Sequence, residues 1–295
     1  MDTPAAAIRA FHDTATGTVS YVVWDRATRR AAAIDPVLDF DAASGRTATR
    51  SVERLLACLR EEGLALDWIL ETHAHADHLS GARHLQTQAG GRIAIGEHIR
   101  EVQAGFARLF NMRGSQAPGA EAFDRLLRDG ETIELGGLRI EALWVPGHTP
   151  ADMAYRIGDD VFVGDTLFMP DLGTARADFP GGDAHRLYRS IRRLLDLPPH
   201  TAIHVCHDYP PPSRGPQWRS TVAEQRARNI HVHDGVDEAA FVALRTARDA
   251  TLGAPALILP SLQINIHGGR LPAAEDNGIA YLRIPVDALG AAAPG

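Results

Sequence analysis

The chain has 295 residues, of which 45% are hydrophobic and 23% charged, a composition ordinary for one large or two small globular domains. The net charge of −7 comes without any basic block, so we expect no nucleic acid among the partners. The sequence holds two cysteines, no secretory signal pattern and no apolar run of about 18 residues, so we expect a cytoplasmic protein that does not associate with membranes.

The first part of the chain alternates strand and helix patterns. Residues 18–24 and 31–34 are rich in β-branched and apolar residues and predict two adjacent strands, whereas the polar stretch 39–49 predicts a loop. Residues 51–62 carry apolar side chains at helical spacing and predict a helix. A short apolar strand, 67–71, follows it.

That strand leads into a loop of metal-binding side chains, His73-Ala74-His75-Ala76-Asp77-His78. Four groups of this kind in so short a stretch are costly to bury together unless a cation offsets their desolvation and crowding. The alternative is a polar loop with incidental histidines. The spacing of the His and Asp residues favours a metal site.

The middle of the chain predicts further strands and helices. Helices are expected at 79–88, 97–110 and 183–195, strands at 92–95 and 203–206, and a flexible loop at 111–120. Two hairpins are expected around glycine-containing turns, 131–135 with 138–145 and 153–157 with 161–163.

Four predicted strands end at or beside a metal-binding residue, namely His73, His148, Asp165 and His207. Such a pattern is typical of a sheet whose loops gather at one edge. We therefore predict an α/β fold, a single αββα sandwich over residues 1–215. Residues 216–295 should form a helical and irregular C-terminal appendage, packed on the core and contributing a wall of the site, with helices at 217–229 and 237–250 and few periodic elements from 257 onward.

The order of these motifs, His-x-His-x-Asp-His followed by Gly-His148-Thr, Gly-Asp165-Thr and His207, resembles the metallo-β-lactamase superfamily. Residues 169–183 look like the glutathione-dependent branch, which holds persulfide dioxygenases and glyoxalase II-type thioesterases. The bacterial persulfide dioxygenases, related to the β-lactamase-like hydrolases, are the closer match. Many of them carry Gly-Arg-Thr-Asp-Phe where this chain has Ala175, Arg176, Ala177, Asp178 and Phe179.

The resemblance implies one of two metal centres. A persulfide dioxygenase would hold one Fe²⁺ through His73, His148 and Asp165, a ligand set that leaves positions open for a thiolate and for oxygen. A hydrolase would hold two Zn²⁺, the first at His73, His75 and His148 and the second at Asp77, His78 and His207, with Asp165 bridging. In the iron centre, His75, Asp77, His78 and His207 could instead serve as hydrogen-bond partners around the ligands. All seven residues are present, so the ligand inventory leaves both centres open.

Three residues are expected to contact substrate. Arg176 and Asp178 belong to the motif above, and Arg176 could grip a substrate carboxylate, or else form a structural ion pair with Asp178. Tyr209 could hydrogen-bond substrate, or else pack at the rim of the site. Cys206 is expected to fill the core. We expect no separate protein nucleophile, because metal-bound O₂ or water would be the reactant. Histidines without a spacing signal, such as His231, are expected at the surface.

The leading hypothesis is a persulfide dioxygenase that oxidises glutathione persulfide, or a similar small persulfide, with O₂ to sulfite and thiol in sulfide detoxification. The first alternative is a dinuclear zinc thioesterase of the glyoxalase II type. The second is a non-enzymatic sulfide- or metal-responsive binding protein, although such a protein would be expected to lose ligands. The expected partners are the persulfide and O₂, with a possible homodimer through the C-terminal appendage.

Overall fold

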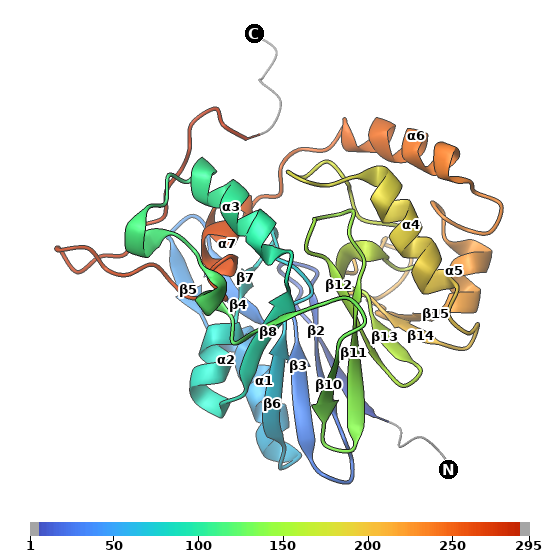
Figure 1. Cartoon of the computed structure of the whole chain (residues 1–295), viewed down its shortest axis with the longest axis horizontal. Helices are drawn as coiled ribbons and strands as arrows, with labels where there is room; N and C mark the ends of the chain where they lie inside the picture. The colour runs from blue at the N-terminus through green and yellow to red at the C-terminus, as the bar shows by residue number, and fades with distance from the viewer. Residues whose placement is uncertain (1–5, 290–295) are drawn as a thin grey trace.

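Two six-stranded sheets face each other and carry helices on their outer sides, so the expected αββα sandwich is confirmed (Figure 1). The computed structural model describes residues 6–289. The strands are β1 Ala7–His12, β2 Val19–Trp24, β3 Arg30–Ile34, β4 Val37–Asp41, β5 Arg46–Ala48, β6 Ala65–Leu70, β7 Leu79–Ser80, β8 Arg92–Gly96, β9 Arg125–Leu127, β10 Thr132–Leu135, β11 Leu138–Trp144, β12 Met153–Ile157, β13 Asp160–Phe162, β14 Ala202–His204 and β15 Arg219–Thr221. The helices are α1 Arg50–Glu61, α2 Ala82–Ala89, α3 Ile99–Leu109, α4 Ala184–Leu195, α5 Val222–Arg228, α6 Glu238–Asp249 and α7 Ile258–Asn265.

The topology brings several loops to one end of the sandwich. In the first sheet, of order β1-β2-β3-β6-β8-β9, strands β3, β6 and β8 run parallel. In the second, of order β10 to β15, β13 and β14 run parallel, and β11 points the same way because both it and β13 are antiparallel to β12. Since the carboxyl ends of parallel strands meet at the same edge of a sheet, the loops that follow β6, β11, β13 and β14 can converge.

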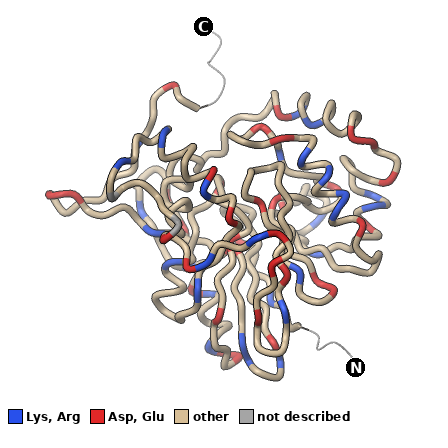
Figure 2. The backbone as a smooth tube through the Cα atoms, in the orientation of Figure 1, with Lys and Arg blue, Asp and Glu red and all other residues tan. Residues whose placement is uncertain are grey.

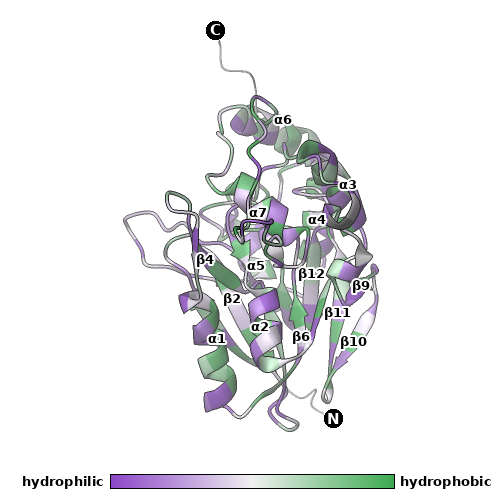
Figure 3. Ribbon diagram, turned by 90° about the vertical axis from the view of Figure 1, so that its left-hand side faces the viewer, coloured by the Kyte–Doolittle hydropathy of each residue, from purple (hydrophilic) through white to green (hydrophobic). Residues whose placement is uncertain are grey.

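Three apolar layers hold the sandwich together. One lies between the two sheets and includes Tyr21, Trp68 and Tyr155. The others lie under α1, α2, α3 and α7 on one outer face and under α4 and α6 on the other. In Figure 3 the strands are largely hydrophobic, while α1 alternates between hydrophobic and hydrophilic residues. This alternation is what a helix with one buried face requires.

Positive and negative side chains are mixed over the described chain, with no region of a single sign. Basic and acidic residues alternate along much of the described chain (Figure 2), and α6 carries both. Within residues 6–289, no helix combines the length and apolar character that crossing a membrane would require.

Two predictions for the first half were wrong. Residues 39–49 form most of the hairpin β4–β5 rather than a loop, and β4 also pairs with β7 in a third, three-stranded sheet. The polar residues of this hairpin face solvent, which hid the strand pattern. The helix expected from residue 79 begins at Ala82, because Leu79 and Ser80 pair with β4 instead. Strands β1 and β9 were not predicted.

The C-terminal part is more closely joined to the sandwich than expected. Strand β15 pairs with β14, so the boundary expected at residue 215 falls before the last strand of the second sheet. The helix expected at 217–229 begins only at Val222, where Thr221 and Glu224 form a reciprocal capping box. Helix α7 was not predicted, and its residues Leu262 and Ile264 are buried in the core.

Candidate metal centre

All seven predicted metal-binding side chains lie together at the converging loops. Four come from the loop between β6 and β7, and one each follows β11, β13 and β14. Their donor atoms form two groups, each with all atoms within 4.8 Å of one another: His73, His148 and Asp165 in the first, and His75, Asp77, His78 and His207 in the second. His75 thus falls with the second group, whereas the dinuclear zinc assignment places it with His73 and His148.

Two glycines allow the ligand loops to approach their neighbours. Gly147, before His148, has φ 147°, and a Cβ there would lie 2.2 Å from the main-chain nitrogen of Leu187. Gly164, before Asp165, has φ 53°, and a Cβ would meet the Thr72 side chain at 2.8 Å. Other residues rarely adopt such conformations, and none would fit the space. These contacts explain why glycine precedes both ligands.

In the first group, hydrogen bonds fix which histidine nitrogens are free. Thr72 donates its hydroxyl to Asp35 at 2.9 Å, so its oxygen accepts from Nδ1 of His73 at 3.0 Å. Nδ1 of His148 donates to the carbonyl oxygen of Arg176 at 2.8 Å. Both Nε2 atoms therefore keep their lone pairs, and they lie 3.8 and 3.6 Å from Oδ2 of Asp165. Such outer hydrogen bonds are what orient metal-binding histidines.

The second group surrounds His207. Its Nε2 lies 3.3 Å from Asp77 and 3.4 Å from Oδ1 of Asp165, so Asp165 stands between the two groups. Nδ1 of His78 is within 3.2 Å of both Thr18 and Asp77. Nε2 of His75 lies 3.0 Å from Asp35 and 3.4 Å from Glu71. In this group, His75 and His78 are each held by neighbours through one ring nitrogen, whereas neither ring nitrogen of His207 has a hydrogen-bond partner.

The unpaired atoms of the cluster provide a test of whether a metal fits. Buried polar atoms without partners each cost about 1–3 kcal/mol. The buried atoms of the cluster that lack a hydrogen-bond partner are Nε2 of His73, Nδ1 of His75, Nε2 of His78, both ring nitrogens of His207 and Oδ1 of Asp165. A concentration of imidazole and carboxylate donors of this kind fits a transition-metal cation and would be unfavourable without one.

The pKa values of His73 and His75 shift in opposite directions. Burial, followed by the neighbouring His75 and His148, holds the pKa of His73 well below its usual value, so this imidazole is neutral near pH 7 and can bind a metal. Burial would lower the pKa of His75 as well, but Asp35 and Glu71 raise it well above its usual value. Without a metal, His75 therefore carries a proton on both ring nitrogens near pH 7, and a metal at Nδ1 would have to displace one of them.

Three supporting residues were missed by the sequence analysis. Asp35 ends β3, next to β6 in the sheet, and accepts hydrogen bonds from Thr72 at 2.7 and 2.9 Å as well as facing His75. Glu71 is buried and also faces His75. Asn265 on α7 holds the carbonyl groups of His75 and His78. A carboxylate at the end of a neighbouring parallel strand could have pointed to Asp35, whereas no local signal marks Asn265.

A cavity of about 330 Å³ opens beside the metal-binding cluster. Its polar lining includes Asp77, His148 and Asp165 of the cluster together with Arg176, Arg245 and Arg248. Its apolar lining includes Phe168, Leu172, Phe179 and Leu252. Because Arg245, Arg248, Leu252 and Pro255 come from α6 and the segment after it, the C-terminal region does form a wall of this cavity, as the sequence suggested.

The predicted substrate residues lie at this cavity, although Arg176 is already engaged. Its guanidinium makes two bonds to Asp178, at 2.6 and 2.7 Å, and another to the carbonyl of Gly253 at 2.6 Å. The structural ion pair is therefore formed. Tyr209 is half-exposed and its ring stacks on His207 with centroids 5.6 Å apart. Cys206 is buried and packs against Asp35, as expected of a core residue.

His231 was expected at the surface and is instead buried, where it accepts a hydrogen bond from the main-chain nitrogen of Thr174 at 3.1 Å. Thr174 lines the cavity, so His231 supports its wall from behind.

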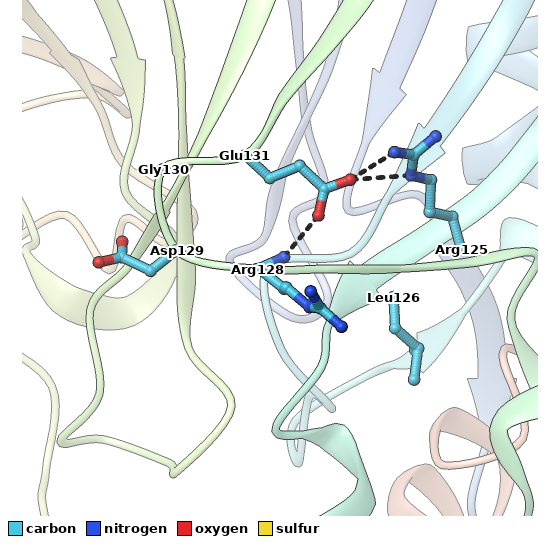
Figure 4. Close-up of a pocket in the computed structure, with 6 residues that line it drawn as sticks. All are labelled: Arg125, Leu126, Arg128, Asp129, Gly130 and Glu131. Atoms are coloured by element: carbon cyan, nitrogen blue, oxygen red, sulfur yellow. Dashed lines mark hydrogen bonds and ion pairs between the residues drawn. The ribbon is translucent and has the colours of Figure 1, made fainter.

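A different hollow, of about 580 Å³, lies at the turn between β9 and β10 (Figure 4). Its charged side chains are already paired: Glu131 accepts bonds from Arg125 and from the main chain of Arg128, and Asp129 pairs with Arg193 at 2.8 Å. None of the metal-binding groups among the described residues lies there, so we assign the functional site to the cavity at the cluster.

Several known proteins are similar to this chain. The sequence pattern of the metallo-beta-lactamase superfamily matches residues 13–207. A probable metallo-hydrolase of Burkholderia pseudomallei is 52% identical over 292 residues, covering 96% of this chain and 99% of that protein. Glyoxylase B2 of Dictyostelium discoideum is 45% identical over 286 residues, covering 96% and 98% of the two chains. Human mitochondrial persulfide dioxygenase ETHE1 is 32% identical over 205 residues, covering 68% of each. The crystal structure of ETHE1 from Myxococcus xanthus matches with a TM-score of 0.73 and 28% identity, covering 90% of this chain and 100% of that one.

Proposed function

This chain belongs to the metallo-β-lactamase superfamily, and from that premise we propose that it is an iron-dependent persulfide dioxygenase. The substrate would be glutathione persulfide or a similar low-molecular-weight persulfide. The net reaction joins one persulfide, one O₂ and one water to give one thiol, one sulfite and two protons. The outer sulfur is oxidised, the S–S bond breaks, and O₂ is reduced.

The observation that carries the proposal is the group of two histidines and one carboxylate beside the cavity. His73, His148 and Asp165 would hold the metal, and a divalent iron bound by two imidazoles and a carboxylate has open positions at which a thiolate and O₂ can react. Thr72 and the carbonyl of Arg176 orient the two imidazoles, so the ligand nitrogens are preset before any metal binds.

The cavity supports an anionic substrate that is anchored away from the reacting sulfur. Arg176 and Arg245 have carboxylate partners, Asp178 and Asp249, at 2.6–2.9 Å. Arg248 lines the same cavity, is exposed, and forms no ion pair with any described residue. We assign Arg248 the role of binding a carboxylate of the peptide arm, with the other two arginines holding the wall in place.

The apolar lining would limit competing hydrolysis. Phe168 and Phe179 line the same cavity as Asp165 and Arg248. Side chains of this kind exclude water around a bound ligand and strengthen the electrostatic interactions there. Cys206 is buried against Asp35 and is not among the residues that line the cavity, so it offers no thiol nucleophile to the substrate.

A dinuclear zinc thioesterase of the glyoxalase II type is the second candidate. The complete second group around His207, with Asp165 between the two groups, favours it. The names of the relatives from Burkholderia and Dictyostelium, a metallo-hydrolase and a glyoxylase, favour it as well.

The two candidates are separated by loading the protein with iron or with zinc and assaying each form on two substrates. For the dioxygenase, iron-loaded protein takes up O₂ with glutathione persulfide, and S-lactoylglutathione is not hydrolysed by either form. Hydrolysis of S-lactoylglutathione by the zinc form, with no oxygen uptake by the iron form, would overturn the proposal. His207→Ala is a useful companion variant, because loss of the second group should abolish dinuclear zinc hydrolysis.

A further inference from the structure

A small second cavity adjoins the substrate cavity at His148. It offers about 20 Å³ in which the centre of a water-sized molecule can move, enough for about one small molecule. Its walls are Ala74 of the metal-binding loop, Val102 and Phe106 of α3, Leu262 of α7, and Phe179 and Pro180. Helices α3 and α7 thus line this cavity, although no residue of either helix lines the substrate cavity.

The lining is unsuitable for water. Apart from His148 and Thr149, every residue that lines the cavity is apolar. Thr149 donates its hydroxyl to Asp152 at 2.6 Å and Nδ1 of His148 donates to the carbonyl of Arg176 at 2.8 Å, so the side-chain polar atom that remains is Nε2 of His148, the atom assigned to the metal. A buried water needs two to four polar partners, and an apolar cavity without them stays dry and takes up apolar gases.

The position of the cavity connects it to the metal-binding cluster. Ala76, His148 and Phe179 line both this cavity and the larger one that holds the cluster. Of the lining residues, Pro180 is exposed and Phe179 is partly buried while the others are buried, so this segment is the part of the wall most open to solvent. A small apolar molecule in this cavity would therefore lie against the ligand His148, and none of the three arginines of the substrate cavity lines it.

We propose that this cavity holds dioxygen beside the metal centre and delivers it from the side of α3 and α7. The inference rests on the proposed dioxygenase function. It gives the two substrates separate routes: the charged persulfide enters past α6, and the uncharged gas enters between α3, α7 and residues 179–180. A hydrolase would have no use for the second route.

Filling and enlarging the cavity at one position provides the test. Val102→Met places a longer side chain into the cavity, and Val102→Ala enlarges it. For Val102→Met we expect the KM for O₂ to rise about fivefold while kcat/KM for the persulfide stays within about twofold of wild type. Val102→Ala should leave or lower the KM for O₂. Leu109→Met, also on α3 but outside the cavity lining, is the matched control and should leave both constants unchanged.

A structural readout accompanies the kinetics. Crystals of the wild-type protein under xenon pressure should show a xenon atom between Val102 and Leu262, and Val102→Met crystals should not. If Val102→Met proves too unstable to purify, Leu262→Met fills the same space from α7. An unchanged KM for O₂ in a filled variant, or no xenon in wild type, would overturn the inference alone. Wild-type iron protein that consumes no O₂ would instead overturn the proposed function, and the inference with it.

Discussion

The side-chain amide of Asn265 donates a hydrogen bond at 2.8 Å to the main-chain oxygen of His78, although 187 residues separate the two in the sequence. The same amide group donates to the main-chain oxygen of His75 and accepts from the main-chain nitrogen of Ser80, both at 2.8 Å. Helix α7 therefore fixes the backbone of the metal-binding loop. The C-terminal region is required for the geometry of the centre, and is more than a cover for it.

Replacing this residue should loosen the loop. Asn265→Leu keeps the size of the side chain but leaves three buried main-chain groups without partners, so we expect a loss of about 3 kcal/mol of unfolding free energy. Metal affinity should fall at least about tenfold, as for other residues that support ligands. Urea unfolding and metal titration measure the two effects. Asn277→Leu, at an exposed position, is the control and should change neither. Equal metal affinity in Asn265→Leu and wild type would contradict this role.

A methyl group at Gly147 should displace His148. The Cβ of Gly147→Ala would meet the backbone of Leu187 at 2.2 Å, in a conformation unfavourable for any side chain. We expect a loss of about 3 kcal/mol or more, together with loss of metal. Gly158→Ala is the matched control, because Gly158 has φ 62° but no atom within 4 Å of a Cβ, so only about 1 kcal/mol of strain is expected. Similar stabilities for the two variants would rule out the close approach as the reason for glycine at position 147.

The carboxylate-binding role of Arg248 predicts a change in KM with little change in kcat. Arg248→Ala should raise the KM for glutathione persulfide about tenfold, because a charge-assisted hydrogen bond at the far end of the substrate contributes binding in ground and transition states alike. Arg176→Ala should instead lower stability, since its partners are Asp178 and Gly253 of the cavity wall. Arg108→Ala, exposed on α3 outside this cavity, is the control. An unchanged KM in Arg248→Ala would remove Arg248 from the substrate site.

Buried His231 should make the fold sensitive to acid. Burial, followed by the nearby charges of Arg245 and Arg248, lowers the pKa of His231 from 6.5 to about 4. Between these pH values the unfolded chain binds a proton at His231 and the folded chain does not, so stability rises with pH through this window and is lost as the pH falls. The loss at pH 4 is at most about 3 kcal/mol.

His231→Gln can still accept the hydrogen bond from Thr174 but cannot take up a proton. We expect its unfolding free energy, measured in urea from pH 4 to 6.5, to fall less steeply toward acid than that of wild type. His233→Gln, at an exposed position two residues away, should follow the wild-type curve. Parallel curves for His231→Gln and wild type would show that this histidine does not contribute.

The sequence was sufficient to predict the sandwich and to find the seven candidate ligands that gather at the metal-binding cluster. These predictions depended on local signals: apolar strands, glycine-containing turns, and ligand residues placed where strands end. Because such loops meet at one end of a sheet, residues as far apart in the chain as His75 and His207 are expected to lie close together, and they do.

What the sequence could not predict depends on contacts between distant segments. Strand β4 pairs with β5 and β7 through main-chain groups, and its polar side chains lack the apolar pattern by which a strand is predicted. The function of Asn265 depends on three main-chain atoms nearly 190 residues away. For Arg176, motif and chemistry allowed both a substrate contact and an ion pair, and the forked contact with Asp178 became visible only in the fold.

The central claim is that the site oxidises a persulfide with O₂ at a centre formed by His73, His148 and Asp165. An oxygen-electrode experiment on protein with about one iron per chain, given glutathione persulfide and coupled to sulfite determination, tests it most directly. We predict one O₂ consumed for each sulfite formed, and no uptake in His148→Ala. No oxygen uptake by the iron-loaded wild type, with S-lactoylglutathione hydrolysed by protein holding about two zinc ions per chain, would contradict the account and favour the thioesterase.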